Sequence, residues 1–150
     1  MRKSILSTAG LFIVFGTFWA CNSGDDVKEA ENEVFAIHDE VMPKTGRILK
    51  LQKQLKQRTV SIDSLKATGS AATTLRIDEE KEQITRLSQN LKVADSLMMD
   101  WMSRYNGDTL TKISSEEALK YLAAQKDQIT DVKSKVNSSI EQANQFLDKK

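Results

Sequence analysis

Apolar residues recur at every seventh position from Val27 onward, and this spacing restricts the chain to helices that pack lengthwise against other helices. The first series is Val27, Val34, Val41, Ile48, Leu55 and Ile62. A second series, three residues later, contains Ile37, Leu51 and Leu65 and is interrupted by Lys44 and Arg58. Two such series form one apolar face of a helix, and a partner helix must cover that face. The pattern predicts a helix over residues 31–66.

Two further helices follow, over residues 74–105 and 115–148. The stretch between Lys66 and Thr74 has the composition of a turn centred on Gly69. Asn106 and Gly107 are expected to end the second helix, because both accept the left-handed conformation common at helix ends. Ser114 and Glu117 have the spacing of a capping box, which begins a helix. The apolar series here are Ile77, Ile84, Leu87, Leu91, Ala94, Met98, Trp101 and Tyr105, and then Ala118, Leu122, Ile129, Val132, Val136, Ala143 and Phe146.

Three helices of nearly equal length with two short connections pack as antiparallel neighbours. We therefore expect an all-α fold, an antiparallel up-down-up three-helix bundle with coiled-coil-like packing, over residues 31–150. Pro43 cannot donate the backbone bond of a helix interior, so the first helix is expected to kink near Pro43; a helix end with a restart at Pro43 is the alternative. Gln125 and Ser139 place polar groups in the apolar series of the third helix. An apolar face that packs against another chain is the alternative, and we favour a monomer.

The first 20 residues predict a lipoprotein signal peptide. Arg2 and Lys3 give a positive start, the sixteen residues from Ile5 to Ala20 carry no charge, and small Ala20 precedes Cys21. A membrane-spanning helix needs about 20 apolar residues, so a retained membrane helix is less favoured. A cysteine that merely lies beside an ordinary cleavage site is the other alternative. An acylated Cys21, the only cysteine, leaves no thiol for a disulfide, and residues 21–30 would form a lipidated flexible tether.

The charge balance argues against nucleic-acid partners. Without Arg2 and Lys3, 20 basic residues (22 minus 2) remain against 21 acidic ones, a net charge of −1. Nucleic-acid binding depends on clustered Lys and Arg that neutralise phosphates. The densest basic set, Lys50, Lys53, Lys56 and Arg58, has no interleaved aromatic residue and is expected to be a solvated helix face.

Antiparallel pairing about Gly69 brings together residues whose numbers sum to about 139, so His38 is expected to face Trp101. His38 and Met42 share one helix face, as do Met98 and Met102. Thioether and imidazole groups suit Cu(I), and His and Met are also axial haem ligands. Methionine more often fills irregular space beside aromatic rings. We favour core packing, with copper or haem binding at His38, Met42, Met98 and Met102 as the alternative, followed by an apolar ligand pocket.

His38 is expected to hydrogen-bond an aspartate across the contact between the first two helices; Asp39, Asp95 and Asp100 are the candidates. Ser96, His38 and an aspartate could be assembled into a hydrolytic triad only on paper, because no strained nucleophile turn or oxyanion hole accompanies them. A general acid and base also need a cleft, which a slender bundle rarely offers. We expect no enzymatic activity.

Several motifs resemble those of a family of small Bacteroidota lipoproteins often labelled viral A-type inclusion protein. The likeness rests on HDEVMPK-x-G at residues 38–46, on A-D-x-x-M-M-x-W-M at residues 94–102 and on a following Tyr121-Leu122. Phe18-Trp19-Ala20-Cys21 also resembles the looser lipoboxes of these bacteria, although Phe18 and Trp19 are bulkier than usual. The resemblance implies an acylated Cys21, a helical body and no assigned activity. Asp25 and Asp26 resemble the acidic tag that sends lipoproteins to the cell surface.

The sequence as a whole predicts a non-enzymatic envelope lipoprotein. Acyl chains on Cys21 would attach it to the membrane, with an outer-membrane and possible surface location. Its helical body would serve as a spacer or as an interaction module for an envelope protein. The alternative is a lipoprotein that binds copper or haem.

Overall fold

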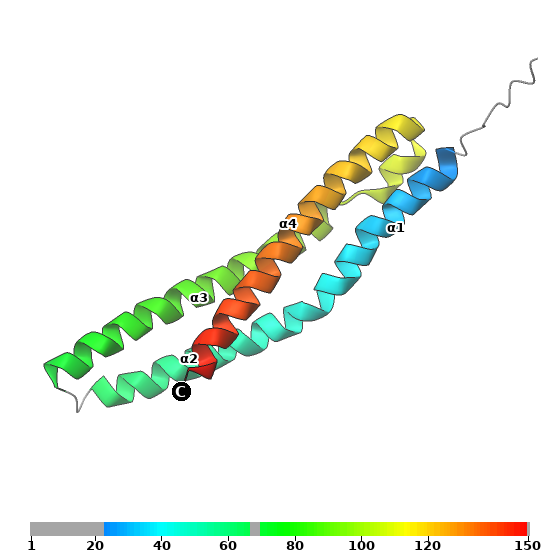
Figure 1. Cartoon of the computed structure of the whole chain (residues 1–150). Coiled ribbons are helices and arrows are strands. Elements are labelled where there is room, and N and C mark those ends of the chain that lie inside the picture. The colour runs from blue at the N-terminus through cyan, green and yellow to red at the C-terminus, as the bar shows by residue number, and fades with distance from the viewer. Residues whose placement is uncertain (1–22, 67–69, 150) are drawn as a thin grey trace, which may run out of the picture.

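The computed structural model describes residues 23–66 and 70–149, which form a bundle of helices without a strand among them. The helices are α1 (Ser23–Val41), α2 (Thr45–Lys66), α3 (Ala71–Arg104) and α4 (Ser115–Asp148), with short 3-10 segments at Met42–Lys44 and Gly107–Thr111. Figure 1 shows α1 and α2 as one long bent arm, with α3 returning along it and α4 packed beside both. This is the expected all-α three-helix bundle. The predicted signal peptide and Cys21 lie outside the described residues.

The core consists of the predicted heptad positions. Every residue of the first series from Val34 to Ile62 is at most 1% exposed. The α3 series from Ile77 to Trp101 is also buried, and so are most positions of the α4 series. Leu65 departs from the pattern, since it is 58% exposed. The heptad repeat therefore predicts which face of each helix is buried, and it fails only near the end of α2.

The polar contacts between helices fix the direction of α4. Lys126 on α4 pairs with Glu33 on α1 at 2.8 Å, and Lys133 pairs with Glu40 at 2.6 Å. Both pairs are separated by 93 residues, so α4 runs parallel to α1 with one register over a heptad. On α2 and α3 the ion pair Arg58–Glu80 instead joins residues whose numbers sum to 138, close to the sum of about 139 expected of antiparallel neighbours. The up-down-up order is confirmed.

Pro43 bends the first arm of the bundle. Met42–Lys44 forms a 3-10 segment between α1 and α2, with the proline near its start. The Thr45 hydroxyl donates a hydrogen bond to the Met42 carbonyl oxygen at 2.9 Å, which satisfies an acceptor where the helix is interrupted. The kink is visible in Figure 1, and the core series continues through it because Val41 and Ile48 are both fully buried.

Two helix ends differ from the expectation. α1 begins at Ser23, so residues 23–30, expected as part of a flexible tether, are helical. Asp25 and Asp26 lie in the first turn of α1, where acidic side chains stabilise a helix N-terminus. α3 begins at Ala71 instead of residue 74, because the Ser70 side chain accepts a hydrogen bond from the Thr73 amide and acts as the N-cap.

The connection from α3 to α4 also differs in its geometry. No described residue has a positive φ, so the expected left-handed conformation at Asn106 or Gly107 is wrong. Tyr105 takes an extended conformation at the end of α3, and Gly107–Thr111 then forms a 3-10 turn. The capping box of Ser114 and Glu117 is present at the start of α4, as predicted. Of the four helices, none is long and apolar enough to cross a membrane, a finding that covers the described residues only.

Candidate functional site

Five rings form a connected cluster between α1, α3 and α4 at the end of the bundle where the chain enters α1. We call it the aromatic cluster. His38 lies 5.7 Å from Trp101 between ring centroids, and Trp101 lies 5.4 Å from Tyr105. Phe35 meets Tyr105 edge to face at 5.2 Å, and Tyr121 lies 6.1 Å from Tyr105. These separations are typical of favourable aromatic pairs, so large rings fill the space between α1 and α3.

Trp101 is the buried centre of this cluster, with 3% of its surface exposed. Its indole Nε1 is buried and has no hydrogen-bond partner among the described residues. An unpaired buried donor costs about 1–3 kcal/mol. The indole therefore stabilises the bundle through its apolar surface and not through its polar atom.

Tyr105 connects the aromatic cluster to a carboxylate. Its hydroxyl donates a hydrogen bond to Oε1 of Glu31 on α1 at 2.9 Å. Burial and this hydrogen bond raise the pKa of Tyr105 well above its usual range, so the phenol stays protonated as a donor. Tyr121 on α4 accepts a hydrogen bond from the Asn106 amide at 2.9 Å. The two phenols thus fix the connection between α3 and α4 against α1.

The four predicted metal ligands lie in different environments. Met98 is fully buried, Met42 is partly buried and packs on the core, and Met102 is 38% exposed. The side chain of His38 is 19% exposed. The predicted pairing of His38 with Trp101 is confirmed. No three His, Cys, Asp or Glu side chains among the described residues form a group that could hold a metal ion.

The expected hydrogen bond from His38 across two helices is wrong. His38 Nδ1 lies 2.9 Å from Oδ1 of Asp39, its neighbour on α1. Asp39 was one of the three candidates, but it belongs to the same helix and cannot fix the register between helices. The register between α1 and α3 comes instead from the stacked rings and from the bond between Tyr105 and Glu31.

One side of the bundle is not covered by α4. On α1 and α2, the residues that precede core positions reach α4: Glu33 and Glu40 bind lysines there, and Arg47 donates to Asn144. On α3, Asn90 holds the equivalent position and binds Gln142 of α4. Residues that follow core positions therefore point away from α4. We call this side, between the α1–α2 arm and α3, the open face.

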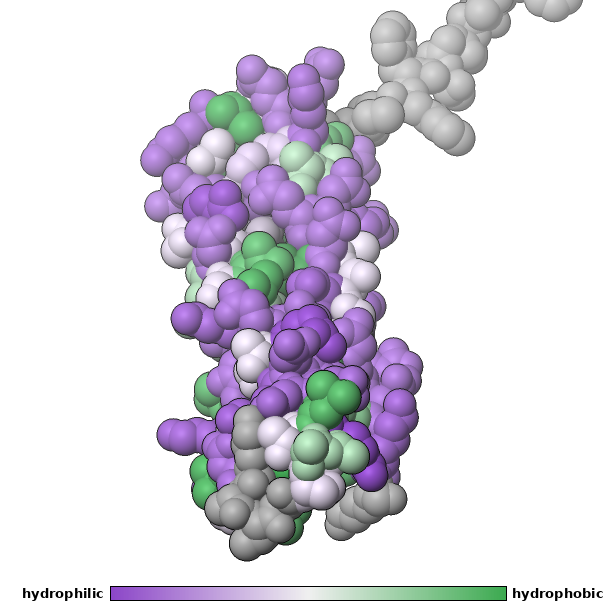
Figure 2. Space-filling view, turned by 90° about the vertical axis from the view of Figure 1, so that its left-hand side faces the viewer, coloured by the Kyte–Doolittle hydropathy of each residue, from purple (hydrophilic) through white to green (hydrophobic). Residues whose placement is uncertain are grey.

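The open face carries most of the exposed apolar residues of the described chain. Five of the eight large exposed hydrophobic side chains lie on it: Phe35 (39%), Leu49 (60%), Met99 (51%) and Met102 (38%) follow core positions, and Val60 (62%) lines a concave region together with Lys56, which follows the core residue Leu55. Single exposed apolar residues are common, but a set that gathers on one face indicates an interaction surface. Figure 2 shows one side of the bundle as largely hydrophilic, with small separate apolar patches.

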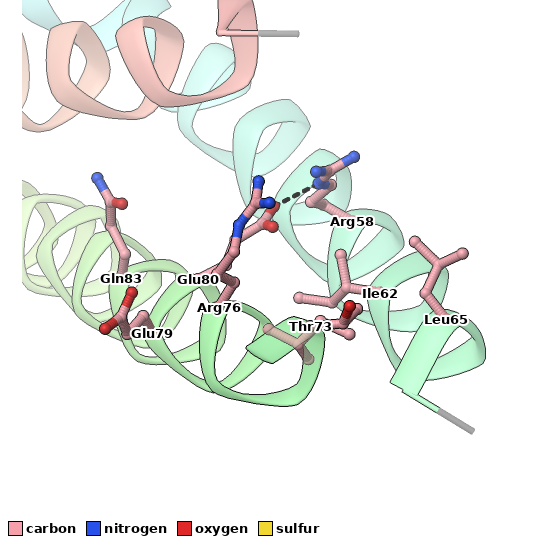
Figure 3. Close-up of a pocket in the computed structure, with 9 residues that line it drawn as sticks. Arg58, Ile62, Leu65, Thr73, Arg76, Glu79, Glu80 and Gln83 are labelled. Atoms are coloured by element: carbon pink, nitrogen blue, oxygen red, sulfur yellow. Dashed lines mark hydrogen bonds and ion pairs between the residues drawn. The ribbon is translucent and has the colours of Figure 1, made fainter. Parts of the chain in front are cut away.

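A second concave region lies where α2 and α3 approach their connection. Arg58 and Ile62 of α2 and Arg76, Ile77 and Glu80 of α3 line it. Figure 3 shows the side chain of Arg76 extending toward the ion pair between Arg58 and Glu80, whose Nε and Oε1 atoms lie 2.6 Å apart. On α2 and α3 a further pair, Asp63 with Lys81 at 2.7 Å, joins the two helices. These charged side chains pair with one another, so this region stabilises the packing of α2 against α3.

Sequence reasoning identified His38 and Trp101 but missed Phe35 and Tyr105 as parts of one cluster. The same pairing rule would have found Phe35 and Tyr105, whose numbers sum to 140. Asp25 and Asp26, the predicted export residues, lie in the first turn of α1. Comparison of the chain with protein-family models, with curated proteins and with solved structures finds no significant match.

Proposed function

We propose that the chain is a non-enzymatic envelope lipoprotein whose helical bundle serves as an interaction module held at the membrane by acyl chains on Cys21. The observation that carries this proposal is the start of α1 at Ser23, two residues after the expected lipid attachment. A helix that begins so close to the lipid attachment leaves only a very short linker between the bundle and the membrane. The bundle would therefore extend from the membrane instead of moving on a long tether.

The dimensions of the bundle suit this role. α3 and α4 have 34 residues each, which correspond to a length of about 50 Å at 1.5 Å per residue. The core is continuous along the chain, from Val34 in α1 to Ala143 in α4. A rod of this kind can place a binding face at a defined distance from the membrane. The open face is the surface that the proposal assigns to this contact.

The test is made in intact Bacteroidota cells. The wild-type chain should incorporate an alkyne-tagged palmitate and enter the detergent phase on phase separation, and Cys21→Ser should do neither. Ser23→Ala, which leaves the cysteine in place, is the matched control. A Cys21→Ser protein that keeps the lipid label and the detergent partition would reject the proposal.

The surface location is tested separately, because it depends on Asp25 and Asp26. Protease added to intact cells should digest the wild-type lipoprotein and spare an Asp25→Ala/Asp26→Ala variant that retains its lipid. Equal digestion of both proteins would show that these two residues do not direct export. That outcome would leave membrane attachment through Cys21 unaffected.

A further inference from the structure

The open face contains a groove between α2 and α3, and its charges are of one sign. Residues Lys56, Thr59 and Val60 of α2 line the groove, together with Ile84, Thr85, Ser88, Gln89 and Lys92 of α3. No carboxylate is among them. Apart from the amide of Gln89, the uncharged lining residues are apolar or carry a hydroxyl, and each helix contributes one lysine.

The two groove lysines differ from the lysines at the contact between α4 and the α1–α2 arm. Lys44, Lys126 and Lys133 all pair with glutamates across or along helices. Within the described chain, no ion pair engages Lys56 or Lys92. Outside the groove lining the open face also carries carboxylates: Glu31 is bound by Tyr105 and Asp63 by Lys81, and Asp78 and Asp95 follow the core positions Ile77 and Ala94 of α3. The lining of the groove therefore carries two lysines and no carboxylate, in a chain whose expected mature charge is −1.

We propose that the open face binds an acidic amphipathic helix of a partner protein, which lies along the groove between α2 and α3. This inference rests on the proposed function and names the class of partner. A groove between two antiparallel helices accepts apolar side chains at the spacing of a third helix. Val60 and Leu49 would contact its apolar face, and Lys56 and Lys92 would pair with acidic residues on its flanks.

Charge also disfavours a second copy of the chain as the occupant. Copies tethered to the same membrane through Cys21 would stand parallel to one another. A symmetric contact through the open face would then place Lys56 and Lys92 close to their own equivalents, and like charges brought together at an interface are destabilising. A partner with glutamate or aspartate on the flanks of its helix avoids this repulsion.

The test uses mature lipoprotein in a nonionic detergent and a fluorescent 21-residue peptide made of three Glu-Ile-Ala-Ala-Leu-Glu-Glu repeats. Fluorescence anisotropy should detect saturable binding that weakens as salt is raised, because salt screens the charges. The same peptide with lysine at every glutamate should not bind. No binding of the acidic peptide, or equal binding of both peptides, would overturn the proposal.

Variants locate the contact on the open face. Lys56→Glu/Lys92→Glu should weaken binding of the acidic peptide by about tenfold or more, since charge reversal replaces attraction by repulsion. Lys50→Glu/Lys120→Glu makes the same change of net charge at exposed lysines outside the groove and should bind as the wild type does. Val60→Ser should also weaken binding while the circular dichroism of the protein stays unchanged. Equal loss in the groove and control variants would show a non-specific charge effect.

Two other occupants are outcomes of the same experiment. Sedimentation of the protein without peptide tests for a dimer, and flotation with phosphatidylglycerol vesicles tests for a lipid surface, using the Cys21→Ser chain. A dimer or vesicle binding that Lys56→Glu/Lys92→Glu abolishes would replace the proposed partner. Peptide binding does not depend on acylation, so its failure is distinguishable from failure of the lipid-labelling test.

Discussion

The Nζ atom of Lys133 on α4 lies 2.6 Å from the Oε2 atom of Glu40 on α1, 93 residues away in the chain. Lys44, one turn after Glu40, donates to the other carboxylate oxygen at 3.1 Å. One glutamate thus joins the kinked arm of the bundle to α4, just before the bend at Pro43. The hydrogen bond from Lys133, followed by that from Lys44, holds the pKa of Glu40 below its ordinary value of 4.5.

The lowered pKa of Glu40 predicts how this contact depends on pH. A carboxyl whose pKa is lower in the folded state stabilises the fold above its ordinary pKa, and this stabilisation is lost as the pH falls through the folded value. Glu40→Gln should therefore lower the melting temperature slightly at pH 7. The difference from the wild type should shrink as the pH falls through the lowered pKa of Glu40 and the carboxyl becomes protonated.

The control for Glu40 is Glu82→Gln. Glu82 is paired with Arg86 within α3 at 3.7 Å and both side chains are largely exposed, so its removal should have less effect at either pH. A Glu40→Gln protein that melts like the wild type at pH 7, or that keeps the same deficit in acid, would contradict the assignment.

Substitutions of Trp101 separate the effect of its buried aromatic side chain from the effect of its unpaired indole N–H. Trp101→Ala should lower the free energy of unfolding by about 3–5 kcal/mol, because it removes a buried aromatic side chain. Trp101→Phe keeps one ring and removes the unpaired indole donor, whose burial costs about 1–3 kcal/mol. It should therefore cost much less than Trp101→Ala. Urea denaturation followed by circular dichroism measures both, and equal losses would mean that the indole nitrogen has a partner.

Ser139 tests the close contact of α3 and α4. It is the one buried polar residue within the described parts of the chain, at 2% exposure, and its hydroxyl donates to the Asn90 carbonyl oxygen at 3.3 Å. Ser139→Ala should change the free energy of unfolding by about 1 kcal/mol or less. Ser139→Leu should cost about 1–3 kcal/mol, because it adds volume to a filled core. Chemical denaturation of the two variants checks this, and a neutral leucine would mean that α3 and α4 are loosely packed there.

The copper and haem alternative is tested with the methionines. If Met98 and Met102 pack with the aromatic cluster, the purified protein should contain neither stoichiometric copper or iron nor a Soret absorbance, and Met98→Leu/Met102→Leu should stay helical. Met99→Leu, at a residue 51% exposed, is the control. Bound metal that the double variant loses, and the control retains, would make the methionines ligands.

The heptad series predicted the three-helix bundle because burial in a long bundle repeats with the helix period. The burial of Val34, Leu91 and Val136 follows from this repeat alone. The predicted burial of Leu65 is wrong because a repeat in one helix does not show where the partner helix ends. Residues 146–149 of α4 share a concave region with Gln54 and Ser61, and Leu65 lies beyond them on α2.

The missed features have local causes. Asp25 and Asp26 were interpreted as part of a polar tether, but acidic residues also stabilise the first turn of a helix, and Val27 and Ala30 pack against the core. The open face could not be predicted from one helix. The position of the open face depends on which side of the α1–α2 arm and of α3 is covered by α4. The contacts of Glu33, Glu40 and Asn90 with α4 show which side this is, and these contacts exist only in the folded chain.

We propose that Cys21 attaches this bundle to a membrane, and intact mass spectrometry of the protein purified from Bacteroidota cells tests this attachment most directly. We expect one species with the mass of residues 21–150 plus acyl chains, and a Cys21→Ser protein whose mass includes no acyl chain. A wild-type protein that retains residues 1–20, or one that begins at Cys21 without acyl groups, would contradict it.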